Sequence, residues 1–116
     1  MVEPFKGKRE APETKVRGEI ITFLEHRQWY VKILHGGVYQ SGFPDLFATH
    51  KNHGIRLIEV KLPNMSGSRF TKHQRECFPL FVSNGAPIWI LTAATEYEYR
   101  KLFAPCNWME YFLLKG

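Results

Sequence analysis

The order of apolar segments along this sequence predicts an α/β fold, in which a mixed β-sheet is flanked by helices. Val16, Ile20, Phe23 and Leu24 recur at helical spacing near the start of the chain. Three short runs rich in β-branched and aromatic residues follow, then a second helical stretch and a fourth such run. Helices and strands that share one short chain in this order are typical of a sheet with helices packed on its faces. The expected order is α-β-β-β-α-β-α.

The position of each element follows from periodicity and from turn residues. The sequence predicts a helix at 13–27, strands at 29–34, 45–49 and 55–61, a second helix at 71–83, a strand at 87–92, a short helix at 95–103 and a candidate edge strand at 109–113. Glycines indicate a loop at 35–42, and proline with glycine indicates a mobile loop at 62–68. Asn84-Gly85 marks the end of the second helix, which Pro79 is expected to kink or shorten.

The size and charge of the chain limit its organisation and its partners. Its 116 residues suffice for one hydrophobic core, so we expect a flexible basic arm at 1–12 and a single domain at 13–116. A hydrophobic content of 44%, with 15% aromatic residues, argues against a disordered chain. The net charge of +5 and the pI near 9.4 favour a polyanionic partner, nucleic acid first.

Composition also sets an expectation for location. No apolar run approaches the roughly 20 residues that a membrane span needs, and the charged N-terminus lacks the apolar core of a signal peptide. Cys77 and Cys106 have no metal-site spacing, and two isolated thiols are typical of a reducing compartment. We therefore expect a cytoplasmic protein without a membrane partner, in which the cysteines serve packing.

Three charged residues in the second and third predicted strands form the strongest functional pattern. Glu59 and Lys61 alternate with Val60 and therefore project from one face of their strand. An acid and an ammonium inside an otherwise apolar strand are costly to desolvate, which indicates either a task or a solvent-facing pair. A hairpin turn near 51–54 would bring the Asp45 carboxylate beside Glu59. Two carboxylates that converge with one Lys can hold Mg²⁺ and orient or deprotonate a water molecule.

This pattern resembles the motif of the PD-(D/E)xK nuclease superfamily, with Pro44-Asp45 as the first half and Glu59-Val60-Lys61 as the second. Over about residues 13–92 the sequence also resembles the VRR-NUC family of virus-type replication-repair nucleases. The matching string consists of Glu19, Gly42-x-Pro44-Asp45-Leu46, Ile58-Glu59-Val60-Lys61 and Phe70-Thr71-x-x-Gln74. The resemblance implies the PD-(D/E)xK fold and a metal-dependent endodeoxyribonuclease, a hydrolase that uses Mg²⁺ and accepts Mn²⁺ in its place.

The resemblance also implies roles for individual residues. Asp45, Glu59 and the Val60 carbonyl, with help from Glu19, would hold one or two metal ions, and Lys61 would act on the attacking water. Gln74 would lie near the active site and contact DNA or an acidic ligand. By charge and position, the residues expected to bind the DNA backbone are Lys72, His73, Arg75, Arg69, Lys15 and Arg17.

Most of these residues have a structural interpretation that the sequence leaves open. Asp45 after a proline is typical of a turn that starts a strand, and Glu59 with Lys61 is compatible with a surface ion pair worth about a few tenths of a kcal/mol. Glu19 flanks the apolar face of its helix and is compatible with a solvated carboxylate. Thr71-x-x-Gln74 fits a capping box, in which the two side chains satisfy reciprocal backbone donors.

Histidines and tryptophans favour structural roles. His50 and His53 flank the predicted hairpin turn, and a zinc site there would need further ligands that the sequence does not offer. The tryptophans are assigned to the core, where large aromatic side chains contribute most; they are Trp29, Trp89 and Trp108.

Together these patterns predict a Mg²⁺-dependent, structure-selective endonuclease that cuts branched DNA, with a four-way (Holliday) junction as the favoured substrate. A homodimer would present two sites to such a junction, and residues 108–114 and the first strand are the candidate dimer surfaces. One alternative is a nicking or end-processing nuclease that serves phage packaging or defence. Others are a catalytically silent DNA-binding module of the same fold and a small basic adaptor protein. The host process, DNA repair included, stays open.

Overall fold

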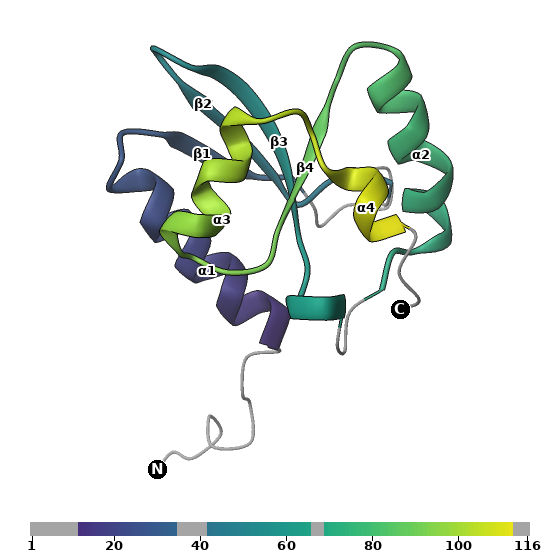
Figure 1. Cartoon of the computed structure of the whole chain (residues 1–116), viewed down its shortest axis with the longest axis horizontal. Helices are drawn as coiled ribbons and strands as arrows, with labels where there is room; N and C mark the ends of the chain where they lie inside the picture. Colours follow the sequence, from purple (N-terminus) through teal and green to yellow (C-terminus); the bar gives the residue numbers. More distant parts are fainter. Residues whose placement is uncertain (1–11, 35–41, 66–68, 113–116) are drawn as a thin grey trace.

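The computed structural model describes residues 12–34, 42–65 and 69–112, which form one sheet and the helices around it (Figure 1). The elements are α1 (Pro12–Glu25), β1 (Tyr30–Ile33), β2 (Leu46–His50), β3 (Gly54–Val60), the 3-10 turn η3 (Pro63–Met65), α2 (Lys72–Ser83), β4 (Ile88–Leu91), α3 (Glu96–Arg100), η4 (Lys101–Phe103) and α4 (Trp108–Phe112). A mixed sheet flanked by helices confirms the predicted α/β fold. Across the described residues, no helix has the length and apolar character that a membrane crossing needs.

The sheet has the strand order β1-β2-β3-β4. β1 pairs antiparallel with β2 and β2 pairs antiparallel with β3, whereas β3 and β4 are parallel. Gly54 ends the turn between β2 and β3 with φ 84°, a left-handed conformation that glycine adopts without steric cost. Parallel neighbours need a crossover, and α2 provides it between β3 and β4.

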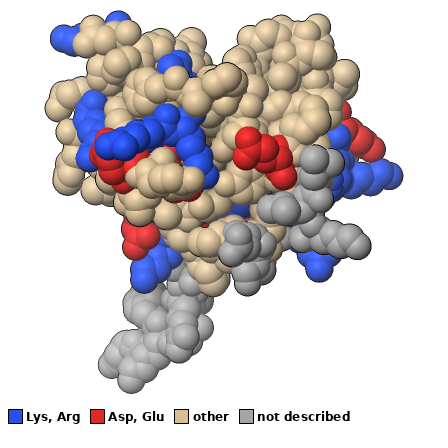
Figure 2. All heavy atoms as spheres, viewed as in Figure 1, with Lys and Arg blue, Asp and Glu red and all other residues tan. Residues whose placement is uncertain are grey.

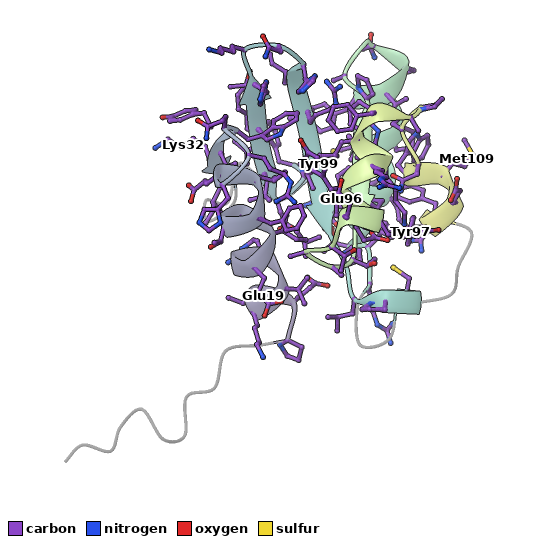
Figure 3. The ribbon with its side chains drawn as sticks, turned by 60° about the vertical axis from the view of Figure 1, so that its left-hand side comes forward. Glu19, Lys32, Glu96, Tyr97, Tyr99 and Met109 are labelled. Atoms are coloured by element: carbon purple, nitrogen blue, oxygen red, sulfur yellow. The ribbon has the colours of Figure 1, made fainter. Side chains whose placement is uncertain are left out.

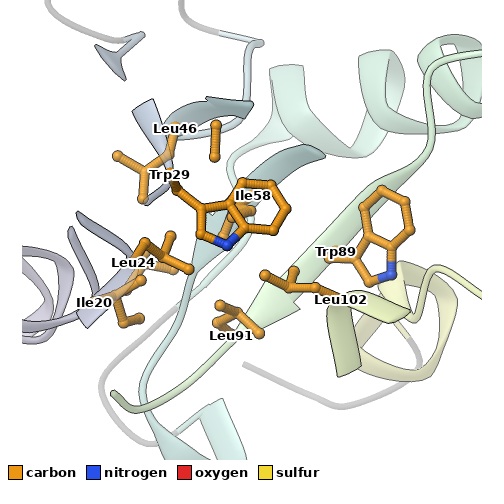
Figure 4. Packing of buried hydrophobic residues seen from close by; sticks show 10 residues of the cluster. Ile20, Leu24, Trp29, Leu46, Ile58, Trp89, Leu91 and Leu102 are labelled. Atoms are coloured by element: carbon orange, nitrogen blue, oxygen red, sulfur yellow. The ribbon is translucent and has the colours of Figure 1, made fainter. Parts of the chain in front are cut away.

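One face of the sheet packs against α1 and the segment after α3. Ile20 and Leu24 of α1 and Leu102 of η4 are almost completely buried against Ile58 and Leu91 of the central strands (Figure 4). The helical spacing of Ile20 and Leu24, which predicted α1, therefore reflects the stripe that this helix buries.

The opposite face packs against α2 and α4, and we call it the α2 face. Its core contains Phe78 of α2 and Ile88 and Ile90 of β4, with Leu57 of β3 packed against them. Figure 1 shows α2 and α4 near each other beyond β4, and α1 and α3 together on the other side. Since side chains alternate along β3, Glu59 projects into the α2 face with Leu57.

The predicted edge strand at 109–113 is wrong, because Trp108–Phe112 form the helix α4. The Asn107 side chain occupies the free edge of β4: its amide oxygen accepts the Ile90 N–H at 2.7 Å, and its amide nitrogen donates to the Ile90 carbonyl at 3.1 Å. A further strand cannot pair at that position. Trp108 and Phe112, four residues apart, instead pack on the α2-face core as one side of a helical turn.

The other differences from the predicted boundaries are small. Pro79 lies inside α2 without shortening it, because Phe78 and the residues after it pack into the α2-face core and hold the helix on both sides of the proline. α1 begins at Pro12, a favoured first helical position, one residue before the predicted start of the helix. The rest of the predicted arm, 1–11, lies outside the described residues. Of the predicted loop at 35–42, the structure describes only Gly42. Of the predicted loop at 62–68, it describes residues 62–65, which include the 3-10 turn η3.

Candidate active site

The sheet register places the two predicted carboxylates side by side. Leu46 of β2 pairs with Ile58 of β3, so Asp45 and Glu59 occupy the next position on the α2 face. The Asp45 N–H donates to Glu59 Oε1 at 3.0 Å, and the Val60 N–H donates to Asp45 Oδ2 at 2.8 Å. Each carboxylate therefore accepts a backbone donor of the other strand. These bonds continue the β2–β3 ladder with side-chain oxygens.

Lys61 lies against Glu59 in the interior. The side chains of Glu59 and Lys61 are 2% and 3% exposed, and Lys61 Nζ lies 3.1 Å from Glu59 Oε2. Lys61 Nζ also donates to the Arg69 carbonyl and lies 4.7 Å from the centre of the Phe70 ring. The pair is therefore buried, and the interpretation as a surface ion pair does not describe it.

Gln74 caps its helix and contacts the site at the same time. The Thr71 hydroxyl accepts the Gln74 N–H at 3.0 Å, and the Gln74 amide oxygen accepts the Thr71 N–H at 3.1 Å, which completes the capping box. The Gln74 amide nitrogen donates to Glu59 Oε2 at 3.0 Å. The two interpretations that the sequence left open are thus compatible, because each end of the amide has its own partner.

Burial dominates the protonation of Glu59. It raises the pKa of this carboxyl from 4.5 to about 8, and the nearby Asp45 charge acts in the same direction. Lys61, through its charge and hydrogen bond, and the Gln74 hydrogen bond lower the pKa by less. Burial therefore favours the protonated form of Glu59 in the metal-free protein, and a bound cation would favour the ionised form.

We expect the metal-free protein to lose stability relative to Glu59→Gln as the pH rises to about 8. In the unfolded chain Glu59 titrates near 4.5, whereas in the fold it titrates near 8, so the folded state binds the additional proton between these values. The contribution of this group is complete below 4.5 and is lost as the pH rises through about 8. Thermal denaturation of both proteins in EDTA across this range measures the difference. A constant difference would contradict the raised pKa.

The donor set fits a hard divalent cation. Both carboxylates offer oxygen, the ligand type that Mg²⁺ prefers. The N–H and C=O of one residue in an extended strand point to the same side, so the Val60 carbonyl faces the Asp45 side, as its N–H does. Val60 lies two residues beyond the last registered β2–β3 pair, so among the described residues no bond of that ladder uses this carbonyl. Asp45, Glu59 and Val60 are therefore the residues that could hold a metal ion.

The structure does not bring Glu19 to these residues. Glu19 is exposed on α1 (Figure 3) and borders an open hollow of about 490 Å³ with Lys15 and His26. In the part of the chain that the structure describes, no three His, Cys, Asp or Glu side chains are close enough to share a metal ion. α1 covers the sheet face opposite Glu59, so the fold gives no support to Glu19 as a metal ligand. The suggested ligand role of Glu19 stays a prediction.

The predicted DNA-binding residues lie on two elements. Lys72, His73 and Arg75 are exposed on the first turns of α2, and Arg69 is exposed just before it. Arg75 also donates to the Phe112 carbonyl at 3.2 Å. Lys15 and Arg17 lie on α1. Figure 2 shows Lys and Arg mixed with Asp and Glu on the face in view, so that face carries no uniform basic patch.

Two contacts near the site could not be found from the sequence. The Arg69 carbonyl holds Lys61, and a backbone acceptor has no sequence signal. Gly42 is buried against α2: a Cβ at this position would lie 2.5 Å from the Cys77 sulfur and 3.1 Å from its Cβ. Gly42 therefore permits the close approach of the segment before Asp45 to α2.

A mixed sheet that presents an Asp on one strand and Glu-x-Lys on the next is typical of a nuclease of the PD-(D/E)xK type. The family model described as the VRR-NUC domain matches residues 12–95, so this chain belongs to the VRR-NUC family. A solved structure described as a VRR_NUC domain superposes with a TM-score of 0.63 at 19% identity, covering 82% of this chain and 98% of that chain, which supports the fold. No curated protein matches the chain. Membership implies a nuclease that acts on DNA, in a family that generally uses divalent metal ions.

Proposed function

We propose that this protein is a divalent-metal-dependent endonuclease that cuts branched DNA in the cytoplasm. The observation that carries the proposal is the set of contacts among Asp45, Glu59 and Lys61. Lys61 Nζ lies 3.1 Å from Glu59 Oε2, and Asp45 accepts the N–H of Val60, the residue between Glu59 and Lys61. Glu59 and Lys61 are buried and Asp45 is half-buried beside them, so the three charges cost desolvation that apolar residues would not. A catalytic task accounts for all three.

The residues would divide the chemistry of phosphodiester hydrolysis. Asp45, Glu59 and the Val60 carbonyl would hold Mg²⁺, with Mn²⁺ as a substitute. When bound, the ion would polarise the scissile phosphate and lower the pKa of the attacking water. Gln74 fixes the Glu59 carboxylate through its 3.0 Å hydrogen bond, as partners of ligating groups generally do.

Lys61 would act on the attacking water and on the phosphate. In the structure its ammonium is shared between Glu59 and the Arg69 carbonyl. A carbonyl partner costs less to exchange than a carboxylate, so the ammonium can turn to a phosphate oxygen without leaving Glu59. There it would offset the negative charge that develops in the transition state. Exposed cations such as Lys72 would bind the DNA backbone without sequence preference.

The test is cleavage of a labelled four-way junction, a flap, a hairpin and a linear duplex with Mg²⁺, with Ca²⁺ and with EDTA. We expect cutting in Mg²⁺, fastest on the branched DNAs, and none in EDTA. Ca²⁺ should permit binding without cutting, because its looser and higher coordination activates water poorly. Efficient cutting in Ca²⁺ or EDTA would contradict the metal mechanism. Binding without cutting in any metal would favour the catalytically silent module.

Two sites related by a twofold axis would suit a four-way junction, so we propose a homodimer. β1 is an outer strand with Ile33 exposed, whereas Trp108 and Phe112 of the other candidate surface pack on the α2-face core. Pairing through the edge of β1 is therefore the favoured contact. Analytical ultracentrifugation measures the assembly. A strict monomer at micromolar concentration that cuts duplex as fast as junctions would leave a general nuclease.

A further inference from the structure

The described helices leave the β1 side of the α2 face uncovered. α2 and α4 pack over β4, whereas β1 contacts mainly β2 and α1. Tyr30 of β1 is 60% exposed and Ile55 of β3 is 57% exposed. Lys32 is also exposed, and Phe47 is half-buried. We call these four residues, Tyr30, Lys32, Phe47 and Ile55, the open face.

The open face lies on the same side of the sheet as the candidate active site. Cross-strand pairs arrange its residues in rows: Tyr30 lies level with Ile55 through Thr49, and Lys32 is paired with Phe47. The next position along β2 and β3 carries Asp45 and Glu59. Ile55 and Glu59 are four residues apart on one strand, about 13 Å at the usual rise. A ligand that reaches the carboxylates can therefore extend over this surface.

The chemistry of the open face favours bases over phosphates. Its side chains are aromatic and aliphatic, and Lys32 is its single charge, with Nζ 5.5 Å from the centre of the Tyr30 ring. Figure 3 shows Lys32 at the outer edge of the sheet. A duplex is bound chiefly through many cation–phosphate contacts, which one Lys cannot supply. Unpaired bases stack on exposed aromatic rings, and a nearby cation accompanies the backbone.

A second copy of this chain fits the open face less well. A twofold contact sets a surface against itself, so two copies of Lys32 would be brought into one small interface. The open face contains no acid that could neutralise this pair. Dimerisation through the edge of β1 would use the backbone and leave this surface accessible.

We propose that the open face binds the unpaired bases of a DNA strand whose phosphodiester lies at Asp45 and Glu59. The inference rests on the proposed nuclease function and narrows its substrate to DNA with a single-stranded segment beside the cut, such as a flap or an opened junction. Tyr30 supplies the stacking surface and Lys32 contacts the adjoining phosphate.

The experiment measures binding of a labelled oligothymidine and of a duplex by fluorescence anisotropy in EDTA, where no metal-dependent cleavage occurs. Tyr30→Thr removes the ring and keeps a residue suited to a strand. Tyr97→Thr is the matched control, since Tyr97 is 75% exposed on α3, on the other side of the sheet. We expect Tyr30→Thr to weaken oligothymidine binding about five-fold or more, with the control unchanged. Lys32→Gln should reduce the slope of the logarithm of the binding constant against the logarithm of the salt concentration by about one, the loss of one phosphate contact.

A second measurement reports contact directly. Photocrosslinking of the wild-type chain to an oligonucleotide with 5-iododeoxyuridine should place an adduct on the tryptic peptide 28–32, at Tyr30. Thermal denaturation of each variant checks the fold. Equal oligothymidine binding by Tyr30→Thr and its control would overturn the inference, as would a loss of dimer with binding unchanged. Binding through Tyr30 without cleavage of any DNA would instead overturn the nuclease function, while the open face would still be assigned as a binding site for unpaired bases.

Discussion

Asp45→Asn is expected to abolish DNA cleavage while folding and DNA binding persist. The amide oxygen of Asn can still accept the Val60 N–H, which Asp45 accepts at 2.8 Å, and the backbone N–H of residue 45 still donates to Glu59. The substitution therefore keeps the local bonds and removes the negative charge that a divalent cation requires. We expect a loss of about 10²- to 10³-fold or more, since removing one electrostatic contributor to a transition state has an effect on this scale.

Single-turnover cleavage of a four-way junction at saturating Mg²⁺ measures this effect, and binding in Ca²⁺ shows that the substrate is still engaged. Glu76→Gln is the matched control, since Glu76 is an exposed carboxylate on α2. This substitution removes one negative charge at a position outside the site, and the variant should cut at the wild-type rate. If Asp45→Asn retained near-wild-type cleavage, Asp45 would have no part in the site.

Lys61→Ala is expected to lower the cleavage rate by about 10²- to 10⁴-fold with little change in metal affinity. The ammonium is 3.1 Å from Glu59 but carries positive charge, so it serves the water and the phosphate, not the cation. Its removal leaves Gln74 as the remaining side-chain donor to Glu59 Oε2. Since the position is buried, Lys61→Gln provides a second variant of similar length that keeps a donor.

The rate is measured across neutral pH at saturating Mg²⁺, and metal affinity is measured separately by calorimetry. A role of Lys61 in activating water should change the shape of the pH profile as well as the rate. A purely structural role of Lys61 would lower the melting temperature of the variant. The pH profile of the cleavage rate of the molecules that remain folded would then be unchanged. A normal rate across neutral pH in both variants would favour an ion pair without catalytic function.

Several features of the site depend on local rules, and the sequence determined them. Strand alternation placed Glu59 and Lys61 on one face, because a period of two follows from extended backbone alone. Thr71 and Gln74 form the predicted capping box, since its bonds join residues within one helical turn. The short hairpin also set Asp45 beside Glu59, because a tight turn fixes the register of the strands it joins.

Tertiary structure decided what depends on contacts between distant elements. Residues 108–112 have strand-like composition, but Asn107 closes the edge of β4 and the α2-face core favours a helix there. Glu19 was a candidate ligand by its place in α1, and the packing of that helix on the other face leaves it exposed.

The clearest division between sequence and structure concerns Glu59. The sequence by itself determined its neighbours in the strand and the partner carboxylate across the hairpin. Its burial, the Gln74 donor on Oε2 and the pKa raised to about 8 arise where the first turn of α2, fifteen residues away in the chain, meets the end of β3. Whether a side chain is desolvated depends on every element packed around it, so this property exists only in the assembled fold.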